Sequence, residues 1–323
     1  MNTLRSACHG GQIPSRLGRG RASRRRHGRR ILRLSCCRII ALTRDQYFAI
    51  ERRVDALERK RPLDLDVVAA AIGRIDNREL FGARLGPAVR YSQRVEADVA
   101  GLSIHTLLPH SPNDHIGRFL EVWVPDESGH GVAQEVLLDH IGLPISPPAD
   151  PDHVPPHNRV AGVFGRLSRH AYTIVSMAYH SIGAMNERLA IGAYGQMARI
   201  CKEIGADEIA DALFTPMRAD ESLHLGYYRT YAMQLRAILA GWQLAAVRAL
   251  IVHTWAPVGA GAKEDRGPFG EVILALEEDP ENPSIAAVIQ DIAQDLLAKD
   301  GETLPPFVHD QLRNCVALAR EAA

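Results

Sequence analysis

Two tetrads with the same spacing, Glu127-Ser-Gly-His130 and Glu221-Ser-Leu-His224, lie on segments with helical patterns. On a helix, residues three positions apart share a face, so each tetrad can direct one carboxylate and one imidazole at the same point. Residues 166–204 separate the tetrads, contain no proline and predict one long helix. Paired Glu-x-x-His tetrads on separate helices are typical of a dinuclear metal site in the core of a four-helix bundle.

The rest of the chain predicts further helices separated by breaks rich in proline and glycine. Thr43 can cap a helix whose apolar residues recur every three or four positions. Residues 143–158 hold six prolines and predict an extended connection, and residues 257–270 predict a glycine-rich loop. Because strand-like alternation is scarce, we expect an all-α fold: a four-helix-bundle core with additional helices. The other expected helices cover residues 88–107, 116–141, a segment ending at Gly241, 282–299 and 306–322.

Charge divides the 323-residue chain into two parts. Residues 1–44 hold twelve arginines and no acid, and the remaining 26 basic residues face 38 acids. We interpret residues 1–42 as a basic N-terminal extension that is disordered or not native, in preference to a nucleic-acid-binding arm or a transit peptide. Residues 43–323 form the predicted helical domain, whose negative charge argues against wrapping nucleic acid.

The same composition bears on the cellular compartment. No stretch reaches the roughly 18 apolar residues of a membrane-spanning helix, so we expect no membrane association. Five scattered cysteines are too few for a disulfide framework and lack zinc-ligand spacing. We therefore expect a protein of the reducing cytoplasm.

The candidate metal ligands follow the order that a dinuclear carboxylate site requires, one set on each expected helix. They are Glu96, then Glu127 with His130, then Glu187, then Glu221 with His224. Glu187 lies in an apolar stretch, where an unpaired buried carboxylate would be costly and a metal would remove that cost. Two alternatives remain to Glu96 as the first metal ligand. Glu96 is a solvated surface carboxylate, or Asp98 is the ligand in its place.

Three motifs around these residues resemble the soluble acyl-carrier-protein desaturases, a di-iron family of the ferritin-like superfamily. Trp123-Val-Pro-Asp126-Glu127-Ser-Gly-His130-Gly131 is similar to the family's Trp-Thr-Ala-Glu-Glu-x-x-His-Gly. Asn186-Glu187-Arg188-Leu-Ala190 is similar to Gln-Glu-Arg-Ala-Thr, and Ala219-Asp220-Glu221-Ser-Leu-His224 matches Ala-Asp-Glu-x-x-His. The resemblance covers roughly residues 45–300 and is strongest between 118 and 230.

The resemblance implies an enzyme of fatty acid metabolism and lipid biosynthesis that uses two irons per chain and O₂ to introduce a double bond into an acyl chain. Glu127 and Glu221 would bridge the metals. His130 with Glu96 would complete one iron's ligands, and His224 with Glu187 the other's. Asp220 would orient a ligating histidine or assist electron delivery. The implied partners are an acyl carrier protein bearing the acyl chain and a ferredoxin-like electron donor, and the implied assembly is a homodimer.

Several positions depart from the family pattern. The family threonine beside the oxygen-binding face is replaced by Ala190, and the first ligand motif is reduced to the segment around Glu96. Pro125 and Pro216 precede Glu127 and Glu221 closely, and a proline inside a helix costs about 3 kcal/mol unless it begins a turn or makes a kink. The chain therefore reads as a divergent member.

Two groups of residues that could contact the substrate or its carrier each have two interpretations. The apolar residues of the long helix line an acyl tunnel or simply form the bundle core; they are Ile174, Val175, Met177, Ala178, Ile182, Met185, Leu189 and Ile191. A basic patch docks the acidic carrier or is a solvated helix face; it comprises Arg52, Arg53, Arg59, Lys60 and Arg61. Two other functions remain: a ferritin-like di-iron oxygenase acting on an amine or another carrier-tethered substrate, and a redox-inactive helical bundle.

Overall fold

The computed structural model describes residues 42–98, 114–147, 156–277 and 279–323, all within one compact unit, Ile39–Ala323. Over these residues every regular element is a helix and no strand is present, which confirms the all-α prediction. The predicted N-terminal extension lies outside the described residues except for Leu42, so its character stays a prediction. No helix in the described ranges is both long and apolar enough to cross a lipid bilayer.

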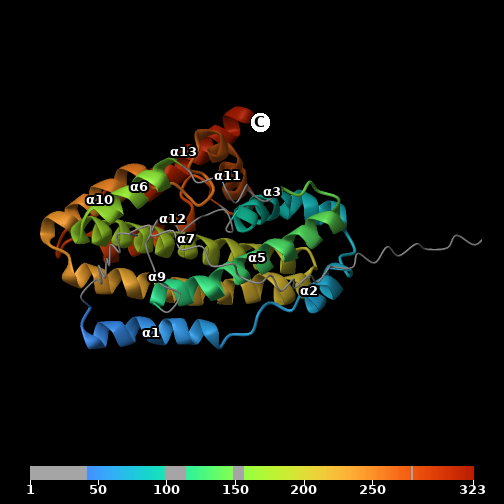
Figure 1. The fold of residues 1–323 in the computed structure, drawn as a ribbon. Coiled ribbons are helices and arrows are strands. Elements are labelled where there is room, and N and C mark those ends of the chain that lie inside the picture. The colour runs from blue at the N-terminus through green and yellow to red at the C-terminus, as the bar shows by residue number, and fades with distance from the viewer. Residues whose placement is uncertain (1–41, 99–113, 148–155, 278) are drawn as a thin grey trace, which may run out of the picture. The chain divides into compact units, whose positions relative to one another are not determined.

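The helices of the described residues are labelled in chain order in Figure 1. Their bounds are α1 Arg44–Glu58, α2 Leu65–Ile72, α3 Arg78–Ala97, α5 His115–Ile141, α6 Pro156–Leu167, α7 Arg169–Glu203, α8 Asp207–Ile209, the π-helix η2 Ala210–Phe214, α9 Thr215–Ile238, α10 Gly241–Thr254, α11 Lys263–Leu276, α12 Ser284–Leu297 and α13 Phe307–Ala322.

Capping residues explain where the two longest helices begin and end. The Asp114 side chain accepts a hydrogen bond from the Gly117 amide at the start of α5, and Ser168 caps α7 in the same way. Gly142 follows α5 with φ 73°, and Gly205 follows α7 with φ 76°. Glycine adopts this left-handed conformation without the steric cost of a Cβ, so both helices end where the sequence predicts.

Four helices pack around the predicted ligands. α7 packs along α9, α3 along α5, and contacts of α3 with α7 and of α5 with α9 close the arrangement. α1 lies along α9 and also contacts α5, while α11 and α13 pack together beside α3 (Figure 1). That these helices form a ferritin-like bundle remains a prediction. The core they share includes some of the largest fully buried side chains, Phe81, Phe119, Phe214, Tyr194 and Tyr227.

Helix α3 begins earlier than the sequence predicts, and α6 and α11 occupy segments where no separate helix was predicted. α3 starts at Arg78, where the Asn77 side chain accepts from the Leu80 amide, and continues through Pro87. α6 occupies residues assigned partly to the proline-rich connection and partly to the long helix. α11 starts at Lys263 and includes Pro268, so the predicted glycine-rich loop is wrong over most of its length.

The two prolines near the tetrads are accommodated differently. Pro216 lies in the first turn of α9, directly after the π-helical turn η2, which leads into α9 without a break. Pro125 lies inside α5, with helix on both sides. The Glu121 carbonyl consequently has no backbone N–H at the position four residues later. Both prolines therefore lie within helical runs, and they differ in that Pro216 directly follows a π-helical turn.

Candidate metal centre

Six buried side chains from four helices make up the predicted site. α3 supplies Glu96 near its C-terminal end, α7 supplies Glu187, and each tetrad occupies one of the other two helices. All six residues are at most 7% exposed. Since carboxylates are almost never buried without partners, their convergence requires a compensating charge or proton.

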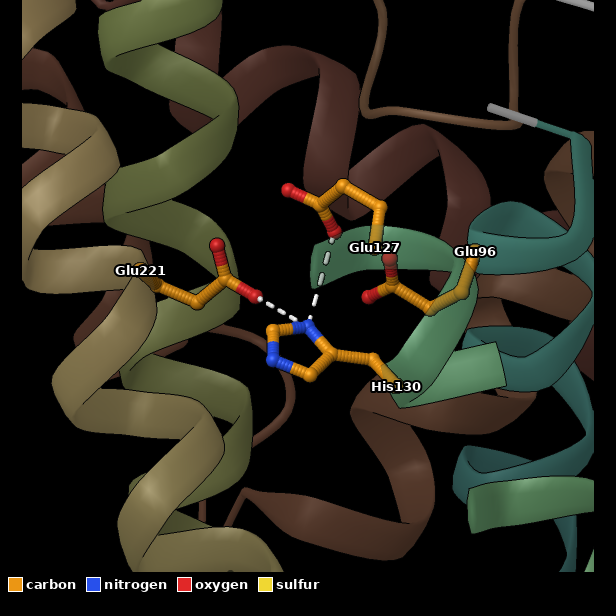
Figure 2. A group of neighbouring side chains, drawn as sticks. All are labelled: Glu96, Glu127, His130 and Glu221. Atoms are coloured by element: carbon orange, nitrogen blue, oxygen red, sulfur yellow. Dashed lines mark ion pairs between the residues drawn. The ribbon is translucent and has the colours of Figure 1, made fainter. Parts of the chain in front are cut away.

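The six residues form two overlapping groups, each with ligand atoms within 4.8 Å of one another. One group contains Glu96, Glu127, His130 and Glu221, and Figure 2 shows these four side chains converging from three helices. The other group contains Glu127, Glu221, Glu187 and His224. Glu127 and Glu221 belong to both, so the arrangement has two terminal pairs and two shared carboxylates. Each group could hold a metal ion.

The two imidazoles present the same nitrogen to the shared carboxylates. His130 Nδ1 lies 3.3 Å from Glu221 Oε1 and 3.6 Å from Glu127 Oε2. His224 Nδ1 lies 2.9 Å from Glu221 Oε2 and 3.1 Å from Glu127 Oε1. Nδ1 is therefore the nitrogen available to a metal in both rings.

The outer nitrogens point at the two aspartates that precede the tetrads, and they do so crosswise. His130 Nε2, on α5, lies 3.1 Å from Asp220 Oδ2 on α9. His224 Nε2, on α9, lies 3.4 Å from Asp126 Oδ2 on α5. A carboxylate on the far nitrogen of a ligating imidazole fixes the ring orientation and raises the basicity of the metal-facing nitrogen. This contact of Asp220 fits the orienting role that the resemblance implies for it.

The electrostatics show how the cluster is neutralised by protons. Burial raises the pKa of Glu96 and of Glu187 well above the usual range, and neighbouring carboxylates raise it further. Burial alone would lower the pKa of both imidazoles, but hydrogen bonds with the surrounding carboxylates raise it well above the usual range. Glu96 and Glu187 are thus favoured as neutral acids, and His130 and His224 as cations.

Two buried atoms in the first group have no satisfactory partner. His130 Nδ1 and Glu221 Oε1 form an ion pair at 3.3 Å, but neither atom makes a hydrogen bond of good geometry. Buried polar atoms left unpaired are costly, and a metal between the ring nitrogen and the carboxylates would satisfy both. Carboxylate and imidazole donors suit iron and manganese, so the residues fit a divalent metal of that kind.

Glu96, and not Asp98, joins the cluster. Asp98 follows the last residue of α3 and belongs to neither ligand group. Glu96 is buried and accepts a hydrogen bond from the Tyr194 hydroxyl, whose oxygen also lies 2.9 Å from the Ser92 hydroxyl. The reading of Glu96 as a solvated surface carboxylate is therefore wrong.

Aromatic side chains occupy the space next to His224. The Phe119 ring meets the His224 imidazole edge to face at 6.3 Å and stacks on Tyr227 at 3.8 Å. The Tyr228 ring lies against Gly183, where a Cβ would approach within 2.5 Å of it, and its hydroxyl is 2.7 Å from that of Tyr179. This end of the site is filled by packed rings.

The apolar residues suggested for an acyl tunnel, and Ala190, all lie on α7. Most of the apolar residues suggested for a tunnel are buried in the core, as the alternative interpretation expected. Leu189 lines a hollow of about 30 Å³ between α7, α11 and α12, which is far smaller than an acyl chain. Ala190 is partly buried one helical turn after Glu187 and so shares its face of α7. Its relation to bound oxygen stays a prediction.

Sequence reasoning missed three residues around the site. Lys60 was assigned to the exposed basic patch, but its ammonium is buried against Asp126 and Asp220, so that assignment is wrong. Asp126 and Tyr194 were not assigned a role. The aspartate before each tetrad was a usable signal for Asp126, and the seven-residue spacing from Glu187 would have placed Tyr194 on the same helical face.

Comparison of the chain with known protein families, curated proteins and solved structures gives no match. The resemblance to the acyl-carrier-protein desaturases thus depends on the three sequence motifs alone.

Proposed function

We propose that this protein is a di-iron, O₂-dependent desaturase that introduces a double bond into an acyl chain carried on an acyl carrier protein. The observation that carries the proposal is the pair of overlapping ligand groups that share Glu127 and Glu221. Such sharing suits two metals bridged by two carboxylates. The three motifs add the substrate class by resemblance.

In the proposed site Glu96 and His130 would hold one iron, Glu187 and His224 would hold the other, and Glu127 and Glu221 would be shared between them. Two irons so held would supply the redox chemistry that reduces O₂ and removes hydrogen from an unactivated carbon. The protein's own part is to present two neutral Nδ1 atoms, keep the rings oriented through Asp220 and Asp126, and exclude water with the packed rings around Phe119.

The proposed reaction balances only with an external reductant. Forming one double bond removes two electrons and two protons from the acyl chain, whereas reducing O₂ to two waters takes four electrons and four protons. The other two electrons come from a ferredoxin-like donor, and the other two protons come from solvent. Purified protein should therefore consume O₂ productively only when both the donor and the acyl carrier are present.

The carrier would dock on α1. Arg52 and Arg53 are exposed there and line a surface hollow of about 330 Å³ with Thr230. Arg53 donates a hydrogen bond to the Thr230 hydroxyl, and no carboxylate of the described residues forms an ion pair with either arginine. Unpaired guanidinium groups favour an acidic partner. Arg59 and Arg61 extend this patch, which excludes the buried Lys60.

A second candidate function is a di-iron oxygenase or oxidase with a different substrate. The packed rings of Phe119, Tyr227 and Tyr228 beside His224, and the small hollow at Leu189, favour it over an enzyme with a preformed acyl tunnel. The products separate the two functions: a desaturase yields an unsaturated acyl chain without incorporated oxygen, whereas an oxygenase yields a product that carries label from ¹⁸O₂.

The proposal is tested first by the iron content of the protein and then by the reaction product. Full-length protein loaded anaerobically with Fe(II) should hold about two irons per chain, and His224→Ala should lose at least one. His140→Ala is the matched control, because His140 lies on α5 outside both ligand groups. Unchanged iron in His224→Ala would overturn the site. Full iron content with no unsaturated product from reduced ferredoxin and stearoyl-carrier protein would overturn the desaturase and leave the oxygenase or a redox-inactive bundle.

A further inference from the structure

Lys60 has a buried ammonium next to the candidate metal centre. The residue follows α1, where its backbone amide bonds to the Leu57 carbonyl, and its side chain is 8% exposed. Lys60 Nζ lies 2.6 Å from Asp220 Oδ2 and 3.0 Å from Asp126 Oδ2. One cation therefore pairs with two carboxylates from two different helices.

Each of these carboxylates continues to one candidate imidazole ligand. Asp220 Oδ2 is 3.1 Å from His130 Nε2, and Asp126 Oδ2 is 3.4 Å from His224 Nε2. The contacts form one continuous chain, from His130 through Asp220, Lys60 and Asp126 to His224. It joins the outer sides of the two ligand groups, whose inner sides are joined by the shared glutamates.

Among these contacts, removal of the Lys60 ammonium would have the highest cost in free energy. In the described part of the structure, Asp126 and Asp220 form ion pairs only with Lys60 and with the two imidazoles. Without Lys60, two carboxylates with side chains at most 12% exposed would face each other with no fixed cation between them. Like charges in that position repel, and each aspartate would turn away from its ring.

We infer that Lys60 is a positioning residue that orients both metal-ligating imidazoles at once by holding Asp126 and Asp220 in place. The inference depends on the metal pair of the proposed function, but not on desaturation. It predicts an asymmetry: losing one aspartate affects mainly the metal position of its own histidine, whereas losing Lys60 affects both positions equally.

A purely structural role for Lys60 makes a different prediction. If the ammonium only anchored the end of α1, replacing it would lower the stability of the fold and leave the metal affinity of the folded protein unchanged. Metal affinity, measured position by position, therefore distinguishes positioning from anchoring.

The experiment is a Mn(II) titration of the full chain followed by electron paramagnetic resonance, which separates free, single and paired manganese. Wild type should bind two ions. Lys60→Met, which keeps length and removes charge, should raise Kd at least tenfold at both positions, within the 10–100-fold range typical of residues that orient ligands. Asp220→Asn should weaken mainly one position. Lys263→Met is the matched control, because Lys263 is exposed and forms no ion pair with any described residue, and this variant should bind like wild type.

Two further variants keep the inference falsifiable. In an Asp126→Asn/Asp220→Asn background, Lys60→Met should add less than about a twofold change, since the residue acts through the aspartates. If Lys60→Met does not fold, Lys60→Arg decides, because a planar guanidinium keeps the charge but not the single-point geometry and should weaken both positions about threefold. Wild-type affinity in Lys60→Met or, failing that, in Lys60→Arg would overturn the role of Lys60. Absence of bound metal in wild type would instead overturn the proposed site.

Discussion

Tyr194 is the residue that most directly ties the protein core to a candidate ligand. Its buried hydroxyl donates to Glu96 and lies 2.9 Å from the Ser92 hydroxyl. Burial and the neighbouring Glu96 raise the pKa of Tyr194 well above its usual range, so the phenol keeps its proton and remains a donor. Glu96 is thereby held at the C-terminal end of α3, where a helix is otherwise free to fray.

Removing that hydroxyl should therefore harm both stability and metal binding. We expect Tyr194→Phe to lower the free energy of unfolding by about 1–3 kcal/mol, the cost of leaving buried partners unpaired. Metal affinity at the position of Glu96 should fall roughly tenfold. The control is Tyr227→Phe, because the Tyr227 hydroxyl is buried without a partner and its loss should cost little. Equal effects of the two variants in denaturant melts would contradict the role given to Tyr194.

The methyl side chain of Ala190 leads to a prediction about how well donor oxidation is coupled to product formation. The family that the three motifs resemble has a threonine hydroxyl at this position. Losing one preorganised donor to a developing negative charge costs about 3 kcal/mol, or roughly a hundredfold in rate. We expect the wild type to turn over slowly or to release much of the reduced oxygen as hydrogen peroxide, and Ala190→Thr to couple better. The measurement is product formed per donor oxidised. A variant no better coupled than its parent would argue against placing Ala190 at the oxygen face.

At the level of residues, local spacing predicted the cluster because ligands three apart on a helix are fixed by helical geometry. The tetrads and Glu187 needed no tertiary information to be recognised. Lys60 could not be found this way, since its position depends on how the end of α1 packs against α5 and α9. One of four lysines in a chain with 34 arginines, it lies between Arg59 and Arg61 and reads as surface.

Helix α1 carries the prediction that concerns a partner. If an acidic carrier docks on its exposed arginines, Arg52→Glu/Arg53→Glu should raise the KM for the acyl carrier about tenfold and leave kcat and metal content unchanged, since charge reversal at a rim changes association. Arg90→Glu is the control, because Arg90 is exposed on α3 and forms no ion pair within the described part of the chain. An unchanged KM would mean that the arginines are only a solvated helix face. The effect should also shrink at high salt.

Helix boundaries show which elements the sequence could specify. α5 and α7 end at glycines with positive φ, and their ends were predicted because that conformation has a residue signature. The start of α3 and the whole of α11 do not follow from the sequence, because proline and glycine are typical of helix breaks. Pro87 and Pro268 lie inside these helices, where packing of α11 on α3 and α13 outweighs the lost backbone bond.

At the scale of the whole molecule, the pKa shifts of the cluster favour a nearly neutral set of buried side chains. Glu96 and Glu187 have raised pKa values because of burial, and His130 and His224 because of their carboxylate partners. The pKa values of Glu127 and Glu221 are lowered by hydrogen bonds from the imidazoles, despite burial. A core with four carboxylates and two imidazoles is thus close to neutral without metal. This explains how it can be buried among four helices.

Metal uptake should therefore expel protons, and its pH dependence has a definite sign. Ligation needs ionised carboxylates and neutral Nδ1 atoms, so up to four protons leave, one each from Glu96, Glu187, His130 and His224. Each proton displaced should weaken binding roughly tenfold per unit fall in pH, below the raised pKa values. We expect net proton release when Mn(II) binds at pH 7, measured by calorimetry in buffers of different ionisation enthalpy. His224→Ala should release fewer, and a wild type that released none would show that these groups are not the ligands.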